Sequence, residues 1–181
     1  MNEHELNTPW ILWFKDPSSK EWTMEKILTI RTIEDFWSFY KYWYHENDTL
    51  SYGYWVLMRE GILPEWKDES NKSGGCWILI TSKNMRANFD NDCFKDFFKS
   101  RSYPLYWRQW LSLSLGCIGE YIYGDKSDKV CGISITSKFK VMNTKIWVSD
   151  SSYAKLSNFS NDLEMKDQMK NFIFKPHECR N

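Results

Sequence analysis

Eleven tryptophans in 181 residues are the feature that most restricts how this chain can fold. Tryptophan has a very large side chain that is rarely buried completely, so a single core cannot enclose all of them. Several stand among charged or turn-forming residues. These are Trp10, Trp22, Trp37, Trp66, Trp77 and Trp147. An exposed indole offers a flat face on which a nucleobase gains roughly 1–3 kcal/mol by stacking, so the pattern predicts an aromatic site that holds a base.

The charge balance restricts what else the site can bind. The 24 basic and 24 acidic residues cancel, so the chain has no overall positive field for non-specific nucleic-acid binding. Any site for a polyanion must therefore be local.

The five cysteines form no C-x-x-C pair, which argues against a zinc site or a disulfide framework and predicts a reducing compartment.

The chain shows no targeting or membrane signal. Its first seven residues are polar and acidic, unlike a signal peptide. No apolar run approaches the roughly 18 residues that a membrane span requires. We therefore expect a cytoplasmic, or also nuclear, protein without membrane contact.

Hydrophobic periodicity predicts strands and helices in one α+β domain. A helix should begin at Thr32, with Glu34 and Asp35 stabilising its first turn. A second helix is expected over 107–120, and a weaker helical stretch over 154–172. Strands are expected over 9–14, 26–30, 52–58, 76–81, 130–136 and 144–148. Antiparallel strands with helices on one face fit this order better than a parallel sheet.

A series of short motifs resembles the translation initiation factor 4E family in order and spacing. They are Trp10–Phe14, Trp22, Thr32–Trp37, Glu60–Trp66, Asn71–Trp77, Ile118–Glu120, Val130–Gly132 and Ile146–Trp147. The resemblance implies a curved antiparallel sheet, backed by three helices on its convex face, that holds the 7-methylguanosine cap of mRNA on its concave face. It further implies a flexible segment over 1–8 and one cap-binding domain over 9–181, with an insert at about 82–103.

The resemblance assigns Trp22 and Trp66 as the two indoles that enclose the methylated base. Methylation at N7 makes guanine cationic, and a desolvated cation gains up to about 2 kcal/mol or more against an indole face. The alternative is that both rings are packed within the protein. Most other tryptophans, Trp10, Trp13, Trp77, Trp110 and Trp147, are interpreted as framework.

The edge of the base is the sharpest departure from the family. Lys67 stands where the family has a glutamate that accepts hydrogen bonds from guanine, and a lysine cannot accept them. An ammonium about 4 Å from a cationic base would be repelled by about 4 kcal/mol at an effective dielectric constant near 20. Lys67 must therefore turn away or change the specificity. Replacement carboxylates are Asp68, which we prefer, Glu65 and Glu69.

The cap phosphates require cations nearby. Lys138 and Lys140 match two basic family positions, and on a strand their i, i+2 spacing would point both the same way. A third basic position is Asn143 here, with Lys145 close by. Cys76 replaces an arginine, so the phosphate contacts are fewer than in the family. The alternative is that these lysines are merely solvated.

A partner surface is expected on the convex side. Ile33 with Trp37, and Leu111 with Leu115, match the family patch that binds scaffold and repressor proteins through a Tyr-x-x-x-x-Leu-hydrophobic helix. Each pair is spaced i, i+4 and so shares a helix face. His4 matches the N-terminal edge of that patch. The alternative is that Trp37 and both leucines belong to the core.

The sequence therefore predicts a monomeric cap-binding translation factor without catalysis or cofactor, since no catalytic motif is present. The insert interleaves aromatic and basic residues, and we expect it to contact the first transcribed nucleotides; a short helix over 92–99 is the alternative. Three other functions stay open. They are a cap-binding repressor, an interaction protein that has lost cap binding, and a binder of a differently modified 5′ end.

Overall fold

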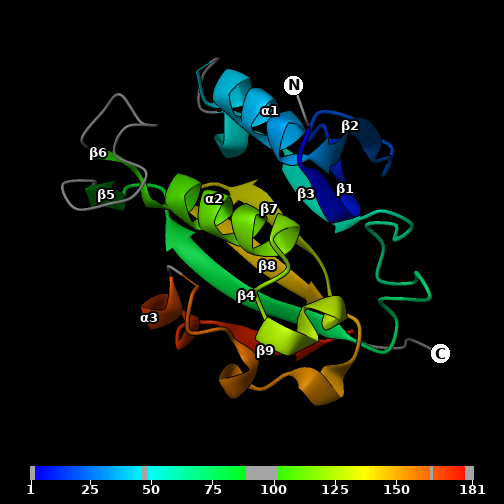
Figure 1. The fold of residues 1–181 in the computed structure, drawn as a ribbon. Helices are drawn as coiled ribbons and strands as arrows, with labels where there is room; N and C mark the ends of the chain where they lie inside the picture. Colours follow the sequence, from blue (N-terminus) through cyan, green and yellow to red (C-terminus); the bar gives the residue numbers. More distant parts are fainter. Residues whose placement is uncertain (1–2, 46–48, 89–101, 164, 178–181) are drawn as a thin grey trace.

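A seven-stranded antiparallel sheet with the order β2-β1-β3-β7-β8-β4-β9 forms the centre of the computed structural model, which describes residues 3–45, 49–88, 102–163 and 165–177 (Figure 1). Its strands are β1 (Glu5–Lys15), β2 (Glu25–Thr32), β3 (Tyr54–Arg59), β4 (Gly75–Ser82), β7 (Val130–Lys138), β8 (Val141–Val148) and β9 (Ile173–Pro176). A separate ribbon pairs β5 (Arg86–Asn88) with β6 (Ser102–Pro104).

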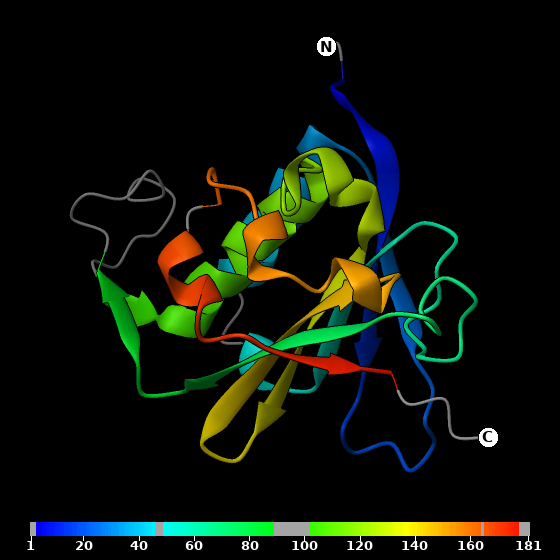
Figure 2. The ribbon, with the colours of Figure 1, turned by 90° about the horizontal axis from the view of Figure 1, so that it is seen from below.

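The helices lie on one face of the curved sheet and leave the other face open (Figure 2). They are α1 (Ile33–His45), α2 (Leu105–Ile118) and the four-residue α3 (Lys166–Met169). Short 3-10 turns lie in the connections: η1 (Thr49–Ser51), η2 (Gly124–Lys129), η3 (Ser151–Tyr153) and η4 (Leu156–Asn158). The predicted α+β fold, a curved antiparallel sheet backed by three helices, is confirmed. Within the described residues, none of these helices has the length and apolar character to cross a membrane.

Helix α1 begins where the sequence predicts, because its first turn is capped reciprocally. The main-chain N–H of Asp35 donates to Thr32 Oγ1 at 3.0 Å, and Asp35 Oδ2 accepts from the Thr32 N–H at 3.1 Å. This is a capping box with aspartate as the acidic partner, and it satisfies donors that a helix start leaves free.

The core fills the space between the helices and the sheet. Helix α1 contributes Phe36, Tyr40 and Trp43, and the Trp43 ring lies 5.3 Å from that of Trp107 on α2. Of the tryptophans interpreted as framework, four are buried and Trp13 is half-buried; the buried ones are Trp10, Trp77, Trp110 and Trp147. Burial of so many indoles explains the high tryptophan content without placing all of them in a binding site.

Two expectations about local structure need correction, and a third lies outside the described residues. Residues 5–8, expected to be flexible, belong to β1, and Glu5 pairs with Thr32 of β2. The stretch over 154–172 is not one helix: its described residues form the short elements η4 and α3, and Phe159 and Leu163 between them are buried in the core. Residues 89–101, most of the expected insert and all of its alternative helix, lie outside the described residues.

Candidate nucleotide-binding cleft

The open face of the sheet contains a cleft of about 840 Å³, bordered by the loop over 16–24 and the loop over 60–74. These loops join β1 to β2 and β3 to β4, and they lie near the end of β9 (Figure 2). Trp22 lies on the first loop with 71% of its surface exposed, and Trp66 lies on the second with 43% exposed. The structure thus brings both predicted stacking residues to one cavity.

Lys15 holds the Trp22 loop. Its buried ammonium donates to the main-chain carbonyls of Asp16, Ser19 and Glu21 at 3.3, 3.4 and 2.9 Å. The same nitrogen lies 5.2 Å from the centroid of the Trp22 ring. A charged donor shared by three carbonyls restrains the loop and also contacts the indole face. Sequence reasoning missed Lys15, although its position at the end of β1, directly before the loop, was a signal.

Asn71 holds the Trp66 loop in a similar way. Its buried side-chain amide donates to the main-chain carbonyls of Leu63 and Glu65 at 3.0 and 2.8 Å. These carbonyls lie just before Trp66 in the chain. The side chain therefore replaces the regular secondary structure that this segment lacks.

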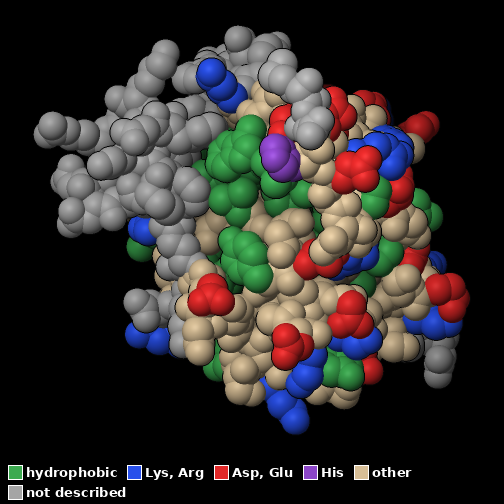
Figure 3. Space-filling model, viewed as in Figure 1, with side chains coloured by type: hydrophobic (Ala, Val, Ile, Leu, Met, Phe, Trp, Pro, Cys, Tyr) green, Lys and Arg blue, Asp and Glu red, His purple; other side chains and the backbone are tan. Residues whose placement is uncertain are grey.

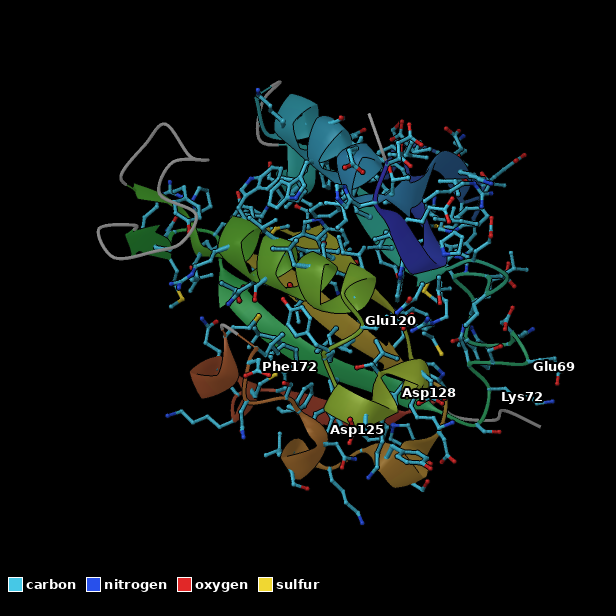
Figure 4. All side chains as sticks on the ribbon, viewed as in Figure 1. Glu69, Lys72, Glu120, Asp125, Asp128 and Phe172 are labelled. Carbon is cyan, nitrogen blue, oxygen red and sulfur yellow. The ribbon has the colours of Figure 1, made fainter. Side chains whose placement is uncertain are left out.

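Asp68, the preferred carboxylate for the base edge, is used inside the loop. Its Oδ2 accepts from the Leu63 N–H at 3.0 Å and its Oδ1 from the Ser70 N–H at 2.8 Å. It does not line the cleft. We therefore correct that prediction: both oxygens satisfy main-chain donors of the turn. Glu69 is also directed elsewhere, since it forms an ion pair with Lys72 on the outside of the loop (Figure 4). Glu65 remains the carboxylate of the cleft.

The predicted phosphate lysines separate in the structure. Lys145 on β8 lines the cleft, whereas Lys138 and Lys140 are exposed in the β7–β8 hairpin and do not line it. The two lysines were expected to point the same way from one strand. This fails because β7 ends at Lys138, so Lys140 belongs to the turn. There the Lys140 ammonium lies 5.6 Å from the ring of Phe139.

Positive charge nevertheless dominates the cleft. Among the described residues, its lining contains one carboxylate, Glu65, and four lysines: Lys15, Lys67, Lys145 and Lys175. The Lys67 ammonium lies 5.4 Å from the centroid of the Trp66 ring. A concave site with this excess of cations attracts phosphate groups. Lys175 was not assigned from the sequence, because only the pairing of β9 with β4 brings it here.

The floor of the cleft is neutral. Burial raises the pKa of the Cys76 thiol and of the Tyr54 hydroxyl to about 12, so both stay protonated at neutral pH. Trp147 completes the floor and donates its indole N–H to Ser134 Oγ at 3.0 Å. The floor therefore supplies polar and aromatic contacts, while the charges come from the walls.

The helical side carries the predicted partner residues. Ile33 is exposed and Trp37 and Leu115 are half-buried, whereas Leu111 has no accessible surface. Leu111 is therefore excluded from a partner surface, because α2 packs it fully into the core. Figure 3 shows hydrophobic side chains gathered over α1 and α2, with a histidine beside them.

His4 is tied to the start of α1. Its ring Nδ1 lies 2.6 Å from Glu34 Oε1, and its main-chain N–H donates to Glu34 Oε2 at 3.0 Å. These hydrogen bonds lower the pKa of Glu34 to about 2. The main-chain carbonyl of His4 accepts from the N–H of Ile33 at 2.9 Å, so His4 lies directly beside that exposed residue.

Comparison with known proteins matches residues 5–179 to the family model described as eukaryotic initiation factor 4E. The chain is 34% identical to eukaryotic translation initiation factor 4E-1A of Danio rerio and 32% identical to eukaryotic translation initiation factor 4E of Homo sapiens, over 82% of its length. It spans only 62% of either relative.

Solved structures show the same fold. The crystal structure of Ascaris suum eIF4E-3 with m7G cap matches with a TM-score of 0.70 and 25% identity, over 98% of this chain and 93% of that one. The complex of C. elegans eIF4E-3 with the 4E-binding protein Mextli also has a TM-score of 0.70, at 22% identity, over 97% and 94% of the two chains.

Proposed function

Since the chain belongs to the eukaryotic initiation factor 4E family, we propose that it binds the 7-methylguanosine cap of mRNA between Trp22 and Trp66. The observation that carries this proposal is that two exposed indoles, on separate loops, line one cleft. A methylated, cationic purine between them gains stacking and cation–π energy on both faces. The similarity to a protein solved with m7G cap supports the same assignment.

The triphosphate lies along Lys145 and Lys175 in this proposal. Both lysines line the cleft, on β8 and β9, close to the Cys76 floor. Lysine binds phosphate mainly through its charge, whereas arginine can also donate two parallel hydrogen bonds. Salt should therefore weaken nucleotide binding strongly. Glu65 is the acceptor for the guanine edge, because it is the carboxylate that lines the cleft.

On the helical side of the sheet, a scaffold or repressor helix of the Tyr-x-x-x-x-Leu-hydrophobic type binds to a surface in this proposal. That surface consists of Ile33, Trp37, Leu115 and His4. Ile33 offers exposed apolar area and Trp37 a half-buried anchor of the kind that dominates interfaces. The protein would thus act by recognition and recruitment in cytoplasmic translation, and not by catalysis.

Titration with m7GTP and GTP tests the proposal. Trp22→Ala and Trp66→Ala should each lower m7GTP affinity roughly five- to 150-fold, since one stacking face is worth roughly 1–3 kcal/mol. Phe139→Ala is the matched control, because Phe139 is 92% exposed but lies outside the cleft. Failure of the intact protein to bind m7GTP, or equal loss in the control, would refute the assignment.

A further inference from the structure

His177, just after β9, joins three parts of the cleft. Its main-chain N–H donates to the carbonyl of Gly74 at 2.9 Å. Its ring Nδ1 lies 2.8 Å from the main-chain oxygen of Asn71, and its Nε2 lies 3.2 Å from Cys76 Sγ. The ring also meets Trp147 edge to face, with centroids 5.2 Å apart.

These contacts define the proton positions on the ring. A carbonyl oxygen only accepts, so Nδ1 carries the hydrogen and donates to Asn71. In the neutral ring Nε2 is then the acceptor, and the Cys76 thiol donates to it. Burial lowers the pKa of His177 and raises that of Cys76, which favours this neutral pair over a thiolate and an imidazolium.

The link to Trp66 runs through Asn71. Its main-chain oxygen accepts from His177, and its side-chain amide donates to the carbonyls of Leu63 and Glu65, just before Trp66. The buried Asn71 therefore connects the main chain just before Trp66 to the ring of His177.

We propose that His177 is a positioning residue for Trp66: by donating Nδ1–H to Asn71 it fixes the 60–74 loop to the end of β9 and so sets the orientation of the indole. The thiol of Cys76 keeps the ring in the tautomer that makes this donation possible. The inference rests on the proposed function, because it gives His177 a role in the same cleft.

The test compares His177→Leu with His177→Asn. Leucine fills the space without a donor, whereas the amide nitrogen of asparagine can take the place of Nδ1. Trp66 is observed directly by ¹⁹F NMR of 5-fluorotryptophan protein, with its signal assigned by Trp66→Phe. Ile173→Ala, at the start of β9 and outside the cleft, is the control.

His177→Leu should shift or broaden the Trp66 signal of the unliganded protein and lower m7GTP affinity roughly three- to tenfold, as expected for one lost hydrogen bond. His177→Asn should keep both properties close to wild type. An unchanged Trp66 signal in His177→Leu, or identical behaviour of the two variants, overturns the inference. Should His177→Leu not fold, His177→Ala replaces it with the same expectations.

The two proposals can fail separately. If the Trp66 signal responds to His177→Leu but even the wild-type protein does not bind m7GTP, the proposed function fails and the positioning role stands. If the wild type binds m7GTP and Trp66 does not respond, the positioning role fails.

Discussion

Replacing Lys67 with glutamate should increase the preference for the methylated cap over unmethylated guanine nucleotide. The Lys67 ammonium lies 5.4 Å from the centroid of Trp66. Since Lys67 lines the cleft, a base stacked about 3.5 Å from that ring would lie at most roughly 9 Å from the ammonium. At that distance the repulsion of a cationic base is about 0.5 kcal/mol in water and about 1.8 kcal/mol at an effective dielectric of 20.

Glutamate turns this repulsion into attraction, so the free-energy change is about twice as large, or about 1–4 kcal/mol. Lys67 is exposed, which places the effect at the lower end, and the ratio of m7GTP to GTP affinity should rise roughly five- to twentyfold. Replacing a lysine with a glutamate also weakens the attraction between the protein and the phosphates. Because m7GTP and GTP carry the same phosphates, this loss cancels in the ratio of their affinities.

Calorimetric titration with both nucleotides, at low and high salt, measures this ratio. The gain should shrink at high salt, because the charge acts through solvent. Lys72→Glu is the matched control: it makes the same charge change on the same loop, but Lys72 points outward toward Glu69 and does not line the cleft (Figure 4). An unchanged ratio in Lys67→Glu, or an equal rise in the control, refutes the reasoning.

Four further results are expected. Lys15→Met should lower m7GTP affinity about tenfold in titration, because the Trp22 loop loses a charged donor shared by three carbonyls; unchanged affinity would contradict this. Trp37→Ala should abolish capture by an immobilised Tyr-x-x-x-x-Leu peptide and keep m7GTP binding, whereas Leu111→Ala should cost about 2–5 kcal/mol in urea unfolding. Burial lowers the pKa of His177 below 6.5, so the unfolded chain takes up the proton at a higher pH than the folded protein does. The free energy of unfolding, measured with urea, should therefore fall as the pH drops below about 6.5. This fall should be smaller in His177→Asn.

Local patterns in the sequence were sufficient for much of the fold. The capping of α1 by Thr32 and Asp35 depends on residues three apart, and the strand pair β7–β8 follows from alternation along a short segment. The family resemblance singled out Trp22 and Trp66, and their polar neighbours, Glu21 and Thr23 for the first and Glu65 and Lys67 for the second, are typical of an exposed position.

The composition of the cleft was decided by strand order and register. Cys76 and His177 are 101 residues apart and meet only because β9 pairs with β4, which also brings Lys175 to the site. The same dependence explains two errors: Lys138 lies at the end of its strand, and the burial of Leu111 depends on what packs around α2.

Interactions between near neighbours in the chain were thus enough to predict the first two helices and most strands of the sheet, and the ordered motifs of the family were enough to identify the two exposed indoles. Only the tertiary structure decided which cations, carboxylates and hydrogen-bond donors share the cavity with them. The physical reason is that one step of strand register moves a side chain to the other face of the sheet, and no local pattern encodes the register between distant strands.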